Sequence, residues 1–576
     1  GNLQITLQET KKEFTGDYTL VVFPLTRYKL GAPPQIADKL GAALQASLPE
    51  VVGYNVIKGF LNLEIANDYW LNFLSDAGKE LNWLQNTHGS EQKVVVEYCS
   101  PNTNKPLHLG HLRNIVLGQS LSNILKANGY EVIPTCLFND RGTNISKSMY
   151  AWEVDGRELT PSQAGMKGDK LVGDFYVSYS KMLGEQTSAL MEKEGLDKKE
   201  ATKQTVAHKA VQEMTIKWEA GDADVRALWE KMNGWVYTAY EDTFARLGVK
   251  YDQYYYESQV YQRGKEAVAE GLEKGLFQQD EDGTVLIDLT EEKLDKKVLL
   301  RSNGTSLYIT QDLAIAADKY NAFQMDKSIY VVGNEQDYHF KVLFKILEKL
   351  GKPYAKGLFH LSYGMVDLPS GKMKSREGTT VEADDLMDDM IAQAKVETQK
   401  LGKTEGMSTE ELEKLYRTLG IGALKYYLAK VDPKKRMLYD PKESIDLHGH
   451  TGPFIQYVYT RTASIRRKAE AEGGIAAFDP AEGLDVDLLE AERNLIKNLY
   501  RYPAVLAEAG QTYNPALIAN YAYEVAKDYN RFYHEAPVIK AENPRSSRFR
   551  FALSNMTGTV LQAAMGLLGI DMPDQM

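Results

Sequence analysis

The chain has 576 residues, 43% of them hydrophobic, which is enough for several domains with buried cores. No apolar run approaches the roughly 20 residues that span a bilayer and no signal-peptide pattern opens the chain, so we expect a cytoplasmic protein. The only cysteines, Cys99 and Cys136, exclude a disulfide framework and a cysteine-based zinc site. With 68 basic against 79 acidic residues the net charge is −11, so nucleic-acid contacts would need local basic patches.

The first part of the chain divides into a small mixed block and the start of a nucleotide-binding fold. Residues 1–88 mix strand and helix patterns and carry no catalytic constellation. Residues 89–150 contain an apolar strand at 94–98, a helical pattern to about Ala127 and a second strand at 131–138. This order predicts parallel strands, whose carboxyl ends hold the ligand.

The middle of the chain interrupts and then completes this fold. Residues 151–250 are charged and helical, which predicts an insertion. Residues 251–400 supply the second half of the nucleotide fold, and its expected segments are 285–289, 307–310, 328–332, a helix at 336–350 and a strand at 358–366.

The last part of the chain reads as helix. Residues 401–445 are expected to be connecting helices, and 446–576 a helical domain. The fold class is therefore α/β: a Rossmann-like parallel-sheet catalytic domain with a helical insertion, a small α/β N-terminal domain and an all-helical C-terminal domain.

A candidate nucleotide site follows the strand at 94–98. Residues Ser100 to His111 read Ser-Pro-Asn-Thr-Asn-Lys-Pro-Leu-His-Leu-Gly-His. A strand that ends in a polar loop and feeds a helix points free N–H groups and the positive helix end at an anion, usually phosphate. His108 and His111 are three residues apart, which predicts that both imidazoles lie on one helix face, and Gly110 leaves room for a flat ligand. The pattern predicts an ATP site.

A second motif, residues 371–378, follows the strand pattern at 358–366 and a Pro-Ser-Gly turn. Its cations Lys372, Lys374 and Arg376 suit a departing pyrophosphate, because charge accumulates on the leaving phosphates as the bond breaks. The alternative is a solvated basic turn.

With these motifs the chain resembles the class I aminoacyl-tRNA synthetases, and among them the arginyl-tRNA synthetase family. His108 to His111 resembles the His-Ile-Gly-His signature of the class, and Lys372 to Arg376 resembles its Lys-Met-Ser-Lys-Ser loop. Ser375 departs from that loop, since the class has a lysine there, and Lys105 would compensate with an ammonium near the triphosphate. Further segments similar to the arginine family are 100–102, 139–142, 308–312, 333–339 and 451–457.

The resemblance implies ATP-dependent attachment of L-arginine to its tRNA through an arginyl-adenylate, with release of pyrophosphate and AMP. His108, His111 and Lys105 would stabilise the phosphates together with the loop cations, and Mg²⁺ would travel with ATP instead of occupying a metal site of the protein. The family commonly needs bound tRNA before it activates arginine. The remaining ATP contacts are assigned to Gly110, Gly333, Glu335, Met365 and Val366.

Arginine recognition calls for carboxylates and an aromatic face, because the guanidinium is a planar cation with five N–H donors. Tyr308 and Asp312 would share a helix face, and they match the guanidinium-binding positions of the family. The other implied arginine contacts are Glu257 and Gln336, with Ser100, Asn102 and Asn139 nearer the α-amino and carboxylate end.

Cationic clusters in the C-terminal helices are interleaved with aromatic residues that can stack on unpaired bases. We therefore expect residues 446–576 to bind the anticodon, and the resemblance implies that residues 1–88 contact the corner of the tRNA. An ordinary solvated helix face is the alternative. The expected partners are arginine, ATP and arginine tRNA, the chain is expected to be a monomer, and the tRNA-binding candidates are Tyr457, Arg461, Phe549 and Arg550.

Three other functions are less consistent with the sequence. Free-standing nucleotidylyltransferases use the same histidine motif but are short and lack a helical C-terminal third. An inactive RNA-binding relative would be expected to lose a histidine or the lysine loop, and both are present. A synthetase for glutamate or cysteine is disfavoured by the Tyr308 and Asp312 pair, which suits a cation.

Overall fold

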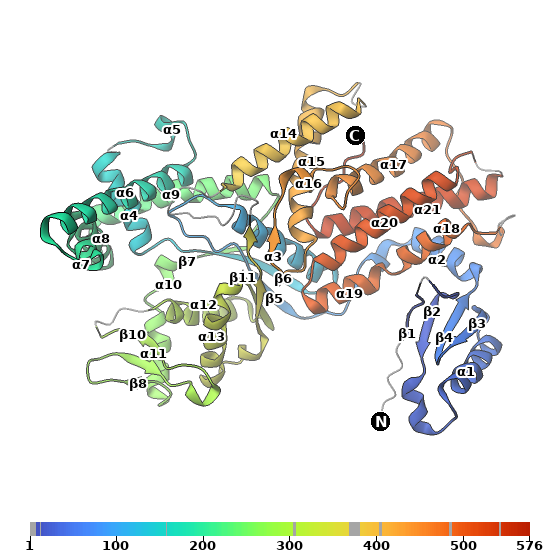
Figure 1. The fold of residues 1–576 in the computed structure, drawn as a ribbon, viewed down its shortest axis with the longest axis horizontal. Coiled ribbons are helices and arrows are strands. Elements are labelled where there is room, and N and C mark those ends of the chain that lie inside the picture. The colour runs from blue at the N-terminus through green and yellow to red at the C-terminus, as the bar shows by residue number, and fades with distance from the viewer. Residues whose placement is uncertain are drawn as a thin grey trace.

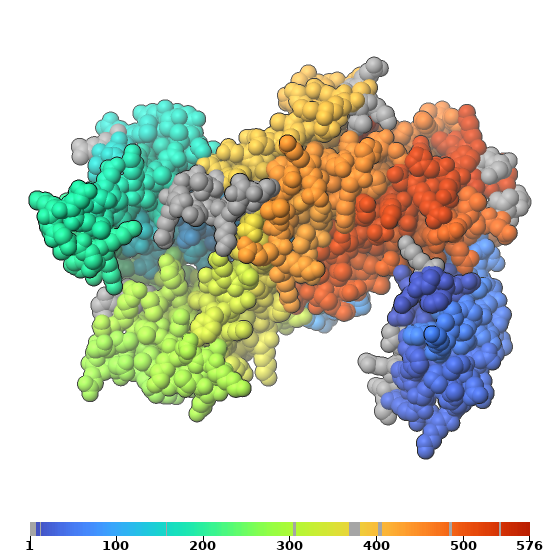
Figure 2. All heavy atoms as spheres, in the orientation of Figure 1, coloured from blue at the N-terminus to red at the C-terminus, as the bar shows by residue number. Residues whose placement is uncertain are grey.

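The chain folds into a central α/β unit with helical units on both sides (Figure 1). The helical insertion extends from one end of this unit, and the C-terminal helices form the other end, with the N-terminal unit lying beneath them. On the face shown in Figure 2, an open space separates the blue N-terminal unit from the green part of the central unit. The computed structural model describes residues 7–11, 13–156, 158–302, 307–367, 381–402, 406–482, 487–540 and 543–576.

The central sheet is parallel throughout, as the sequence predicted, and its strand order is β12-β11-β5-β6-β7. The chain runs outward from β5 to β7 and then returns to place β11 on the other side of β5. Ligands of open α/β sheets bind at such a reversal, beyond the carboxyl ends of the strands. The strands are β5 (Lys93–Glu97), β6 (Glu131–Phe138), β7 (Gln253–Tyr256), β11 (Lys327–Gly333) and β12 (Leu358–Tyr363).

Helix α3 (Leu109–Ala127) connects β5 to β6 and carries the histidine motif at its start. Its apolar residues are buried on all sides, because the sheet covers one face and other helices cover the rest. Gly118 is required by close packing, since a Cβ at this position would lie 2.2 Å from the Tyr98 ring. The middle of α3 therefore packs directly on the Tyr98 ring just after β5.

Two of the segments expected in this sheet lie elsewhere. The segment at 285–289 forms β9 (Val285–Ile287), which belongs to a separate antiparallel sheet with β8 (Gln278–Gln279) and β10 (Lys297–Leu300). The segment at 307–310 is not a strand, because α12 (Tyr308–Phe323) begins at Tyr308. The fifth strand is instead the tyrosine-rich β7, whose pairing with the end of β6 depends on tertiary contacts that the local pattern does not encode.

The insertion is helical over the expected range, and its helices are α4 (Thr143–Asp155), α5 (Pro161–Ala164), α6 (Gly168–Glu194), α7 (Lys198–Gln204), α8 (Val206–Ala220) and α9 (Ala223–Arg246). Several helices begin at a side chain that accepts backbone N–H groups, such as Asp197 and Asp222. Helices α10 (Glu257–Val260) and α11 (Gly264–Glu273) follow β7, and α13 (Asp337–Lys349) connects β11 to β12. The elements between the sheet and the C-terminal helices include β13 (Val366–Asp367), α14 (Ala383–Leu401), α15 (Thr409–Ala429), β14 (Met437–Leu438) and α16 (Pro441–Ser444).

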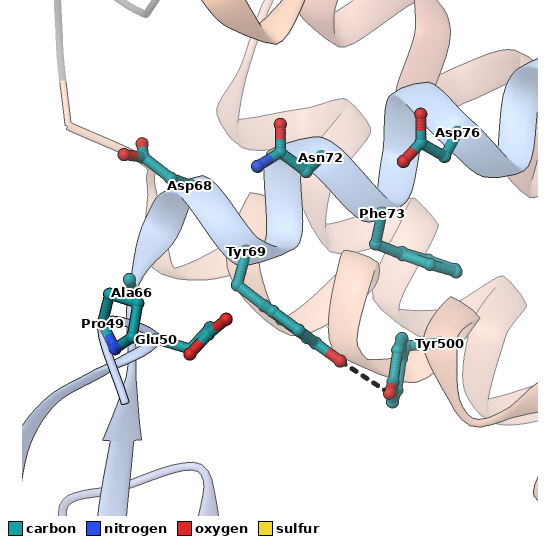
Figure 3. Close-up of a pocket in the computed structure, with 9 residues that line it drawn as sticks. All are labelled: Pro49, Glu50, Ala66, Asp68, Tyr69, Asn72, Phe73, Asp76 and Tyr500. Carbon is teal, nitrogen blue, oxygen red and sulfur yellow. Dashed lines mark hydrogen bonds between the residues drawn. The ribbon is translucent and has the colours of Figure 1, made fainter. Parts of the chain in front are cut away.

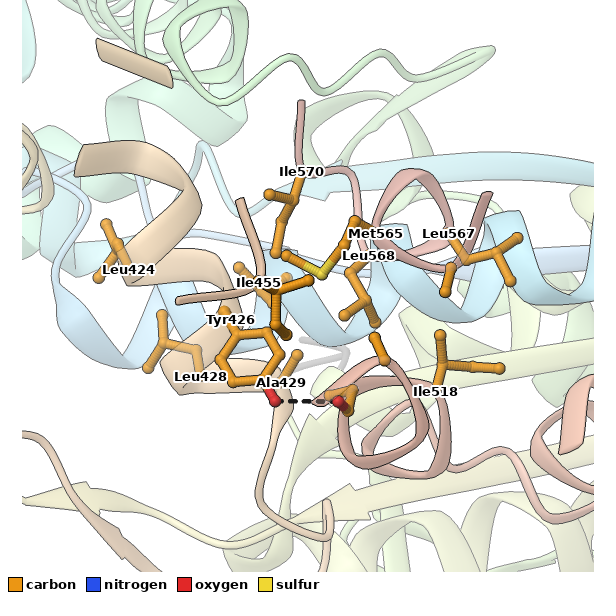
Figure 4. Close-up of a cluster of buried hydrophobic side chains, with 14 of the residues drawn as sticks. Leu424, Tyr426, Leu428, Ala429, Ile455, Ile518, Met565, Leu567, Leu568 and Ile570 are labelled. Carbon is orange, nitrogen blue, oxygen red and sulfur yellow. Dashed lines mark hydrogen bonds between the residues drawn. The ribbon is translucent and has the colours of Figure 1, made fainter. Parts of the chain in front are cut away.

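The C-terminal helices pack on one another, and some of them also pack on α15; Figure 4 shows buried side chains that they share. Leu424 and Leu428 of α15 contribute to this core, and the Tyr426 hydroxyl donates to the Ala519 carbonyl at 2.9 Å. The helices are α17 (Gly452–Ala471), α18 (Glu490–Tyr500), α19 (Tyr502–Thr512), α20 (Ala516–Glu535) and α21 (Pro544–Leu567).

The N-terminal unit is a four-stranded antiparallel sheet with helix α1 (Pro33–Ser47) packed against it. Asp17 is buried and pairs with Arg493 at 2.7 Å and Lys497 at 2.9 Å, which ties this unit to α18. Helix α2 (Asn67–Lys79) packs on the same region, and Figure 3 shows the Tyr69 hydroxyl meeting that of Tyr500 at 2.8 Å. The strands are β1 (Leu7–Glu9), β2 (Tyr18–Val21), β3 (Val51–Ile57) and β4 (Phe60–Ile65).

A buried ion pair fastens helix α12 to the central strand. The Lys319 Nζ atom lies 2.7 Å from the Glu97 carboxylate at the end of β5, and both side chains are almost inaccessible. The same ammonium lies 4.2 Å from the centre of the Tyr330 ring. Because β5 leads into the histidine motif and α12 carries Tyr308 and Asp312, this pair fixes one half of the candidate site against the other.

Replacing Lys319 by methionine should destabilise the protein by about 3 to 5 kcal/mol, because it leaves the Glu97 carboxylate buried without a counter-charge. Urea unfolding followed by circular dichroism would measure the loss. The double variant Lys319→Met with Glu97→Leu should recover much of it. Lys400→Met is the control, since its pair with Glu397 is exposed and worth less than about 1 kcal/mol. If Lys319→Met and Lys400→Met lost the same free energy of unfolding, Lys319 and Glu97 would not be a buried pair on which stability depends.

Candidate active site

The end of β5 turns sharply into the histidine motif. Cys99 and Ser100 adopt positive φ values of 76° and 35°, a strained conformation for residues with a Cβ. The turn brings the following residues alongside Asn139, whose N–H donates to the Pro101 carbonyl at 2.9 Å and whose side chain donates to the Ser100 carbonyl at 3.0 Å. Asn102 and Asn139 form a β-bridge. The structure therefore brings the predicted residues Ser100, Asn102 and Asn139 together.

The Ser100 hydroxyl is buried and has no hydrogen-bond partner among the described residues. An unsatisfied buried hydroxyl costs free energy, and a polar ligand group would satisfy it. This makes Ser100 a candidate contact for the bound substrate.

The two histidines cap helix α3 reciprocally. His108 is the residue before the helix, and its Nδ1 accepts the Gly110 N–H at 3.1 Å. His111 Nδ1 accepts the His108 N–H, also at 3.1 Å. The ring centroids lie 3.9 Å apart, which confirms that both imidazoles share one face. A side chain in place of Gly110 would crowd this ring, since a Cβ at position 110 would lie 3.0 Å from the His108 ring.

Both imidazoles are neutral, and each carries its proton on the same ring nitrogen, Nε2. Burial lowers the pKa of His108 to about 3 and lowers the pKa of His111 well below its usual range, and the nearby Lys105 ammonium acts in the same direction. A neutral imidazole whose Nδ1 accepts a hydrogen bond carries its proton on Nε2. The motif therefore holds two Nε2–H donors, and burial also lowers the pKa of Lys105.

The second motif is represented here by its flanks alone. Lys372, Lys374, Ser375 and Arg376 lie outside the described residues. After them, the Val381 carbonyl accepts the Leu109 N–H at 3.3 Å, and the Ala383 N–H donates to the Leu107 carbonyl at 2.8 Å. Glu382 also forms a β-bridge with His108. On the other side, just before the motif, β13 pairs with β14. The described residue after the segment thus lies directly against the histidine motif.

An acidic group of side chains lies at the start of α12. Tyr308 is the first helical residue and is 69% exposed, and Asp312 follows one turn later with its carboxylate 2.6 Å from His339 Nε2. Glu257 begins α10 and is 5% exposed. Burial raises the pKa of Glu257 to about 7; the Arg141 guanidinium opposes this rise, and the Asp140 and Asp312 carboxylates add to it. Gln336 is exposed in the turn before α13.

Asp140 organises this acidic group, although no site role was predicted for it. Its carboxylate accepts the Tyr237 hydroxyl at 2.8 Å and both the N–H and the hydroxyl of Ser258, at 2.8 and 2.7 Å. It therefore links α9 of the insertion to the start of α10, where Glu257 lies. The Asn-Asp-Arg-Gly segment that contains Asp140 could have indicated a role for it in the sequence. Its hydrogen-bond partners could not be inferred, because they lie about 100 residues away.

The other predicted ATP contacts lie at the end of β11 and just beyond β12. A Cβ on Gly333 would lie 3.7 Å from the Met365 sulfur, so these two residues are neighbours. Glu335 is exposed and Val366 is buried. Among the described residues no group of three His, Cys, Asp or Glu side chains could hold a metal ion.

The four candidates for RNA contact differ in exposure. The Arg461 guanidinium lies 4.6 Å from the Tyr457 ring on α17, and both residues keep part of their surface exposed. Phe549 is 1% exposed and packs on Phe478, while Arg550 is 2% exposed and pairs with Glu492 at 2.6 Å. Phe549 and Arg550 are therefore core residues and offer no surface to a base, because their face of α21 points into the helical domain.

The helices of the described residues include none long and apolar enough to cross a membrane.

The family model for the class I (R) tRNA synthetase catalytic domain matches residues 74–438, and the DALR anticodon binding domain matches residues 455–576. The arginine–tRNA ligase of Bacteroides fragilis is 50% identical over 574 residues, which covers 100% of this chain and 96% of the relative. That of Porphyromonas gingivalis is 48% identical over 576 residues, which covers 100% and 96%.

The fold is similar to that of Thermus thermophilus arginyl-tRNA synthetase, with a TM-score of 0.78 at 22% identity over 99% of this chain and 96% of the other. The resemblance inferred from the two motifs is thus confirmed over the full length. This chain belongs to the arginyl-tRNA synthetase family.

Proposed function

We propose that this protein attaches L-arginine to its tRNA in two ATP-dependent steps and that the residues assembled around α3 and α12 carry them out. The observation that carries this assignment is the pair of Nε2–H donors at the start of α3. The family comparisons support the overall reaction.

In the first step an arginine carboxylate oxygen bonds to the α-phosphorus of ATP, and the bond to the β-phosphate oxygen breaks with release of pyrophosphate. No protein nucleophile is needed, so catalysis consists of positioning and electrostatic stabilisation. His108 and His111 would donate to phosphate oxygens as charge develops, and being neutral they can do so without change in protonation. Lys105 would supply positive charge near the triphosphate, as would the loop residues Lys372, Lys374 and Arg376. Mg²⁺ would enter bound to ATP.

The remaining ATP contacts follow from the sheet reversal. Gly110 would allow the nucleotide to approach the helix start, and Gly333, Glu335, Met365 and Val366 would contact it from the ends of β11 and β12. This assignment is supported by two observations. Gly333 and Met365 are neighbours, and both lie at the carboxyl edge of the sheet, where such sheets bind ligands.

Arginine would bind with its guanidinium toward Asp312 and Glu257, with the Tyr308 ring and Gln336 completing that end. Asp312 near the start of α12 and Glu257 at the start of α10 place two carboxylates in one region. Carboxylates can accept the forked N–H groups of the guanidinium. Ser100, Asn102 and Asn139 would bind the α-amino and carboxylate end, and the unpaired Ser100 hydroxyl supports this orientation.

In the second step a terminal ribose hydroxyl of the tRNA attacks the acyl carbon of the adenylate, and AMP leaves. The C-terminal helices would read the anticodon, with Tyr457 and Arg461 as the accessible candidates. Residues 1–88 would contact the corner of the tRNA, and we propose a cytoplasmic monomer.

Exchange of pyrophosphate into ATP, measured with each amino acid in the presence and absence of tRNA, tests this function. Arginine alone should support exchange, and omission of tRNA should reduce it. Exchange with another amino acid but not with arginine would contradict the assignment.

Asp312→Ala should lower kcat/KM for arginine by about 10²- to 10³-fold, because the guanidinium loses a partly buried counter-charge. The KM for ATP should stay close to that of the wild-type protein. Asp318→Ala is the matched control, since it removes a paired carboxylate from the same helix. If the two variants had equal arginine kinetics, Asp312 would be a structural residue.

Arginine affinity should rise with pH between about 6 and 8, because the free protein holds Glu257 with a pKa of about 7 and the guanidinium prefers the ionised carboxylate. At pH values well below 7 the association constant for arginine should change by nearly tenfold per pH unit. Isothermal titration calorimetry with arginine would measure it. Glu257→Gln should bind more weakly and show a flat profile over this window, and an unchanged slope in that variant would assign the titration to another group.

A further inference from the structure

A cationic pocket of about 380 Å³ lies where four parts of the chain meet, away from the site described above. Gln119 of α3, the end of α9, one face of α15 and the residues after α21 line it. Gln119 is eight residues beyond His111, about 12 Å along the helix axis. The pocket is therefore separate from the histidine motif, although one helix connects them.

Lys425 forms a buried part of the lining and is 2% exposed. Its ammonium donates to the Gly569 carbonyl at 2.6 Å and to the Gln119 side-chain oxygen at 3.0 Å, and both acceptors are uncharged. An ammonium has three N–H groups, so these two bonds leave one donor without an acceptor among the described residues. Burial lowers the pKa of Lys425 to about 8, and the Asp571 carboxylate in the same lining offsets this only in part.

Two further cations lie on the same helix. Lys414 and Arg417 are exposed, and neither has an ion-pair partner in the part of the chain that the structure describes. Lys414 and Lys425 are eleven residues apart, which places them on one helix face at opposite ends of the pocket, about 16 Å apart along the axis, with Arg417 between them. Asp571 is the carboxylate that opposes them in the lining, and Arg246 is already paired with Asp384 and Asp388.

We propose that this pocket binds a phosphate group. Three cations with one opposing carboxylate form a concave site whose wall includes a buried ammonium, and the oxygens of a phosphate can accept from several directions. A volume of this size is typical of small-ligand sites. The phosphate could belong to a small phosphate ester or to an RNA backbone, and the experiment separates the two sources.

The test uses the full-length protein and a double variant, Lys414→Gln with Arg417→Gln, whose exposed side chains are not needed for folding. The control is Lys265→Gln with Lys356→Gln, which removes the same charge from exposed positions without ion-pair partners among the described residues. The first arm measures thermal stability against inorganic phosphate. The wild-type protein and the control should be stabilised, and the pocket variant should need at least about tenfold more phosphate for the same shift.

The second arm measures tRNA affinity against salt concentration. If the phosphate comes from RNA, the pocket variant should lower the slope of log K against log salt by about two units relative to the control. A change in the first arm alone identifies a small phosphate ligand. Identical behaviour of the pocket variant and the control in both arms would overturn the proposal. Neither arm reads arginine activation, so that outcome leaves the proposed function untouched.

Discussion

The reciprocal capping at the start of α3 is the interaction on which the rest of the site depends. Because each Nδ1 accepts a backbone N–H, each imidazole is oriented and its proton is confined to Nε2. Because both rings are desolvated beside Lys105, they stay neutral and act as donors without competing with the positive charges around them. The β-bridge from His108 to Glu382 then attaches the chain that follows the lysine loop to the same helix start.

The acidic half of the site is held in place by partners distant in sequence. Lys319 and Glu97 join α12 to the central strand inside the core, and Asp140 joins the start of α10 to the insertion. Such buried groups cost free energy to desolvate, and they are stable only while each has its partner. The free protein accordingly holds Glu257 with a raised pKa, a state that a bound cation would relieve. If arginine binds here as proposed, its binding would be linked to the protonation of this carboxylate.

The sequence predicted the elements that local patterns determine and missed those that tertiary contacts determine. The strand and helix around His108 followed from an apolar run and a long periodic segment, and they appear as β5 and α3. The short strand β7 is defined by its pairing with Phe138 and its neighbours, so the local pattern could not place it. Asp140 was missed because Tyr237 and Ser258 lie about 100 residues away. Phe549 and Arg550 were expected to meet RNA because alternating cationic and aromatic residues do not reveal which face of α21 is buried.

The protonation state of the histidine pair is the claim that a single measurement tests most directly. Nuclear magnetic resonance of ¹⁵N-histidine-labelled protein, with His108 and His111 assigned through single substitutions, reports tautomer and charge for each ring. We expect both residues to show the Nε2–H tautomer and to stay neutral from pH 8 down to pH 5, since the pKa of His108 is about 3 and that of His111 is also far below its usual range. Titration of either ring near its ordinary pKa of about 6.5, or a proton on Nδ1, would contradict the account.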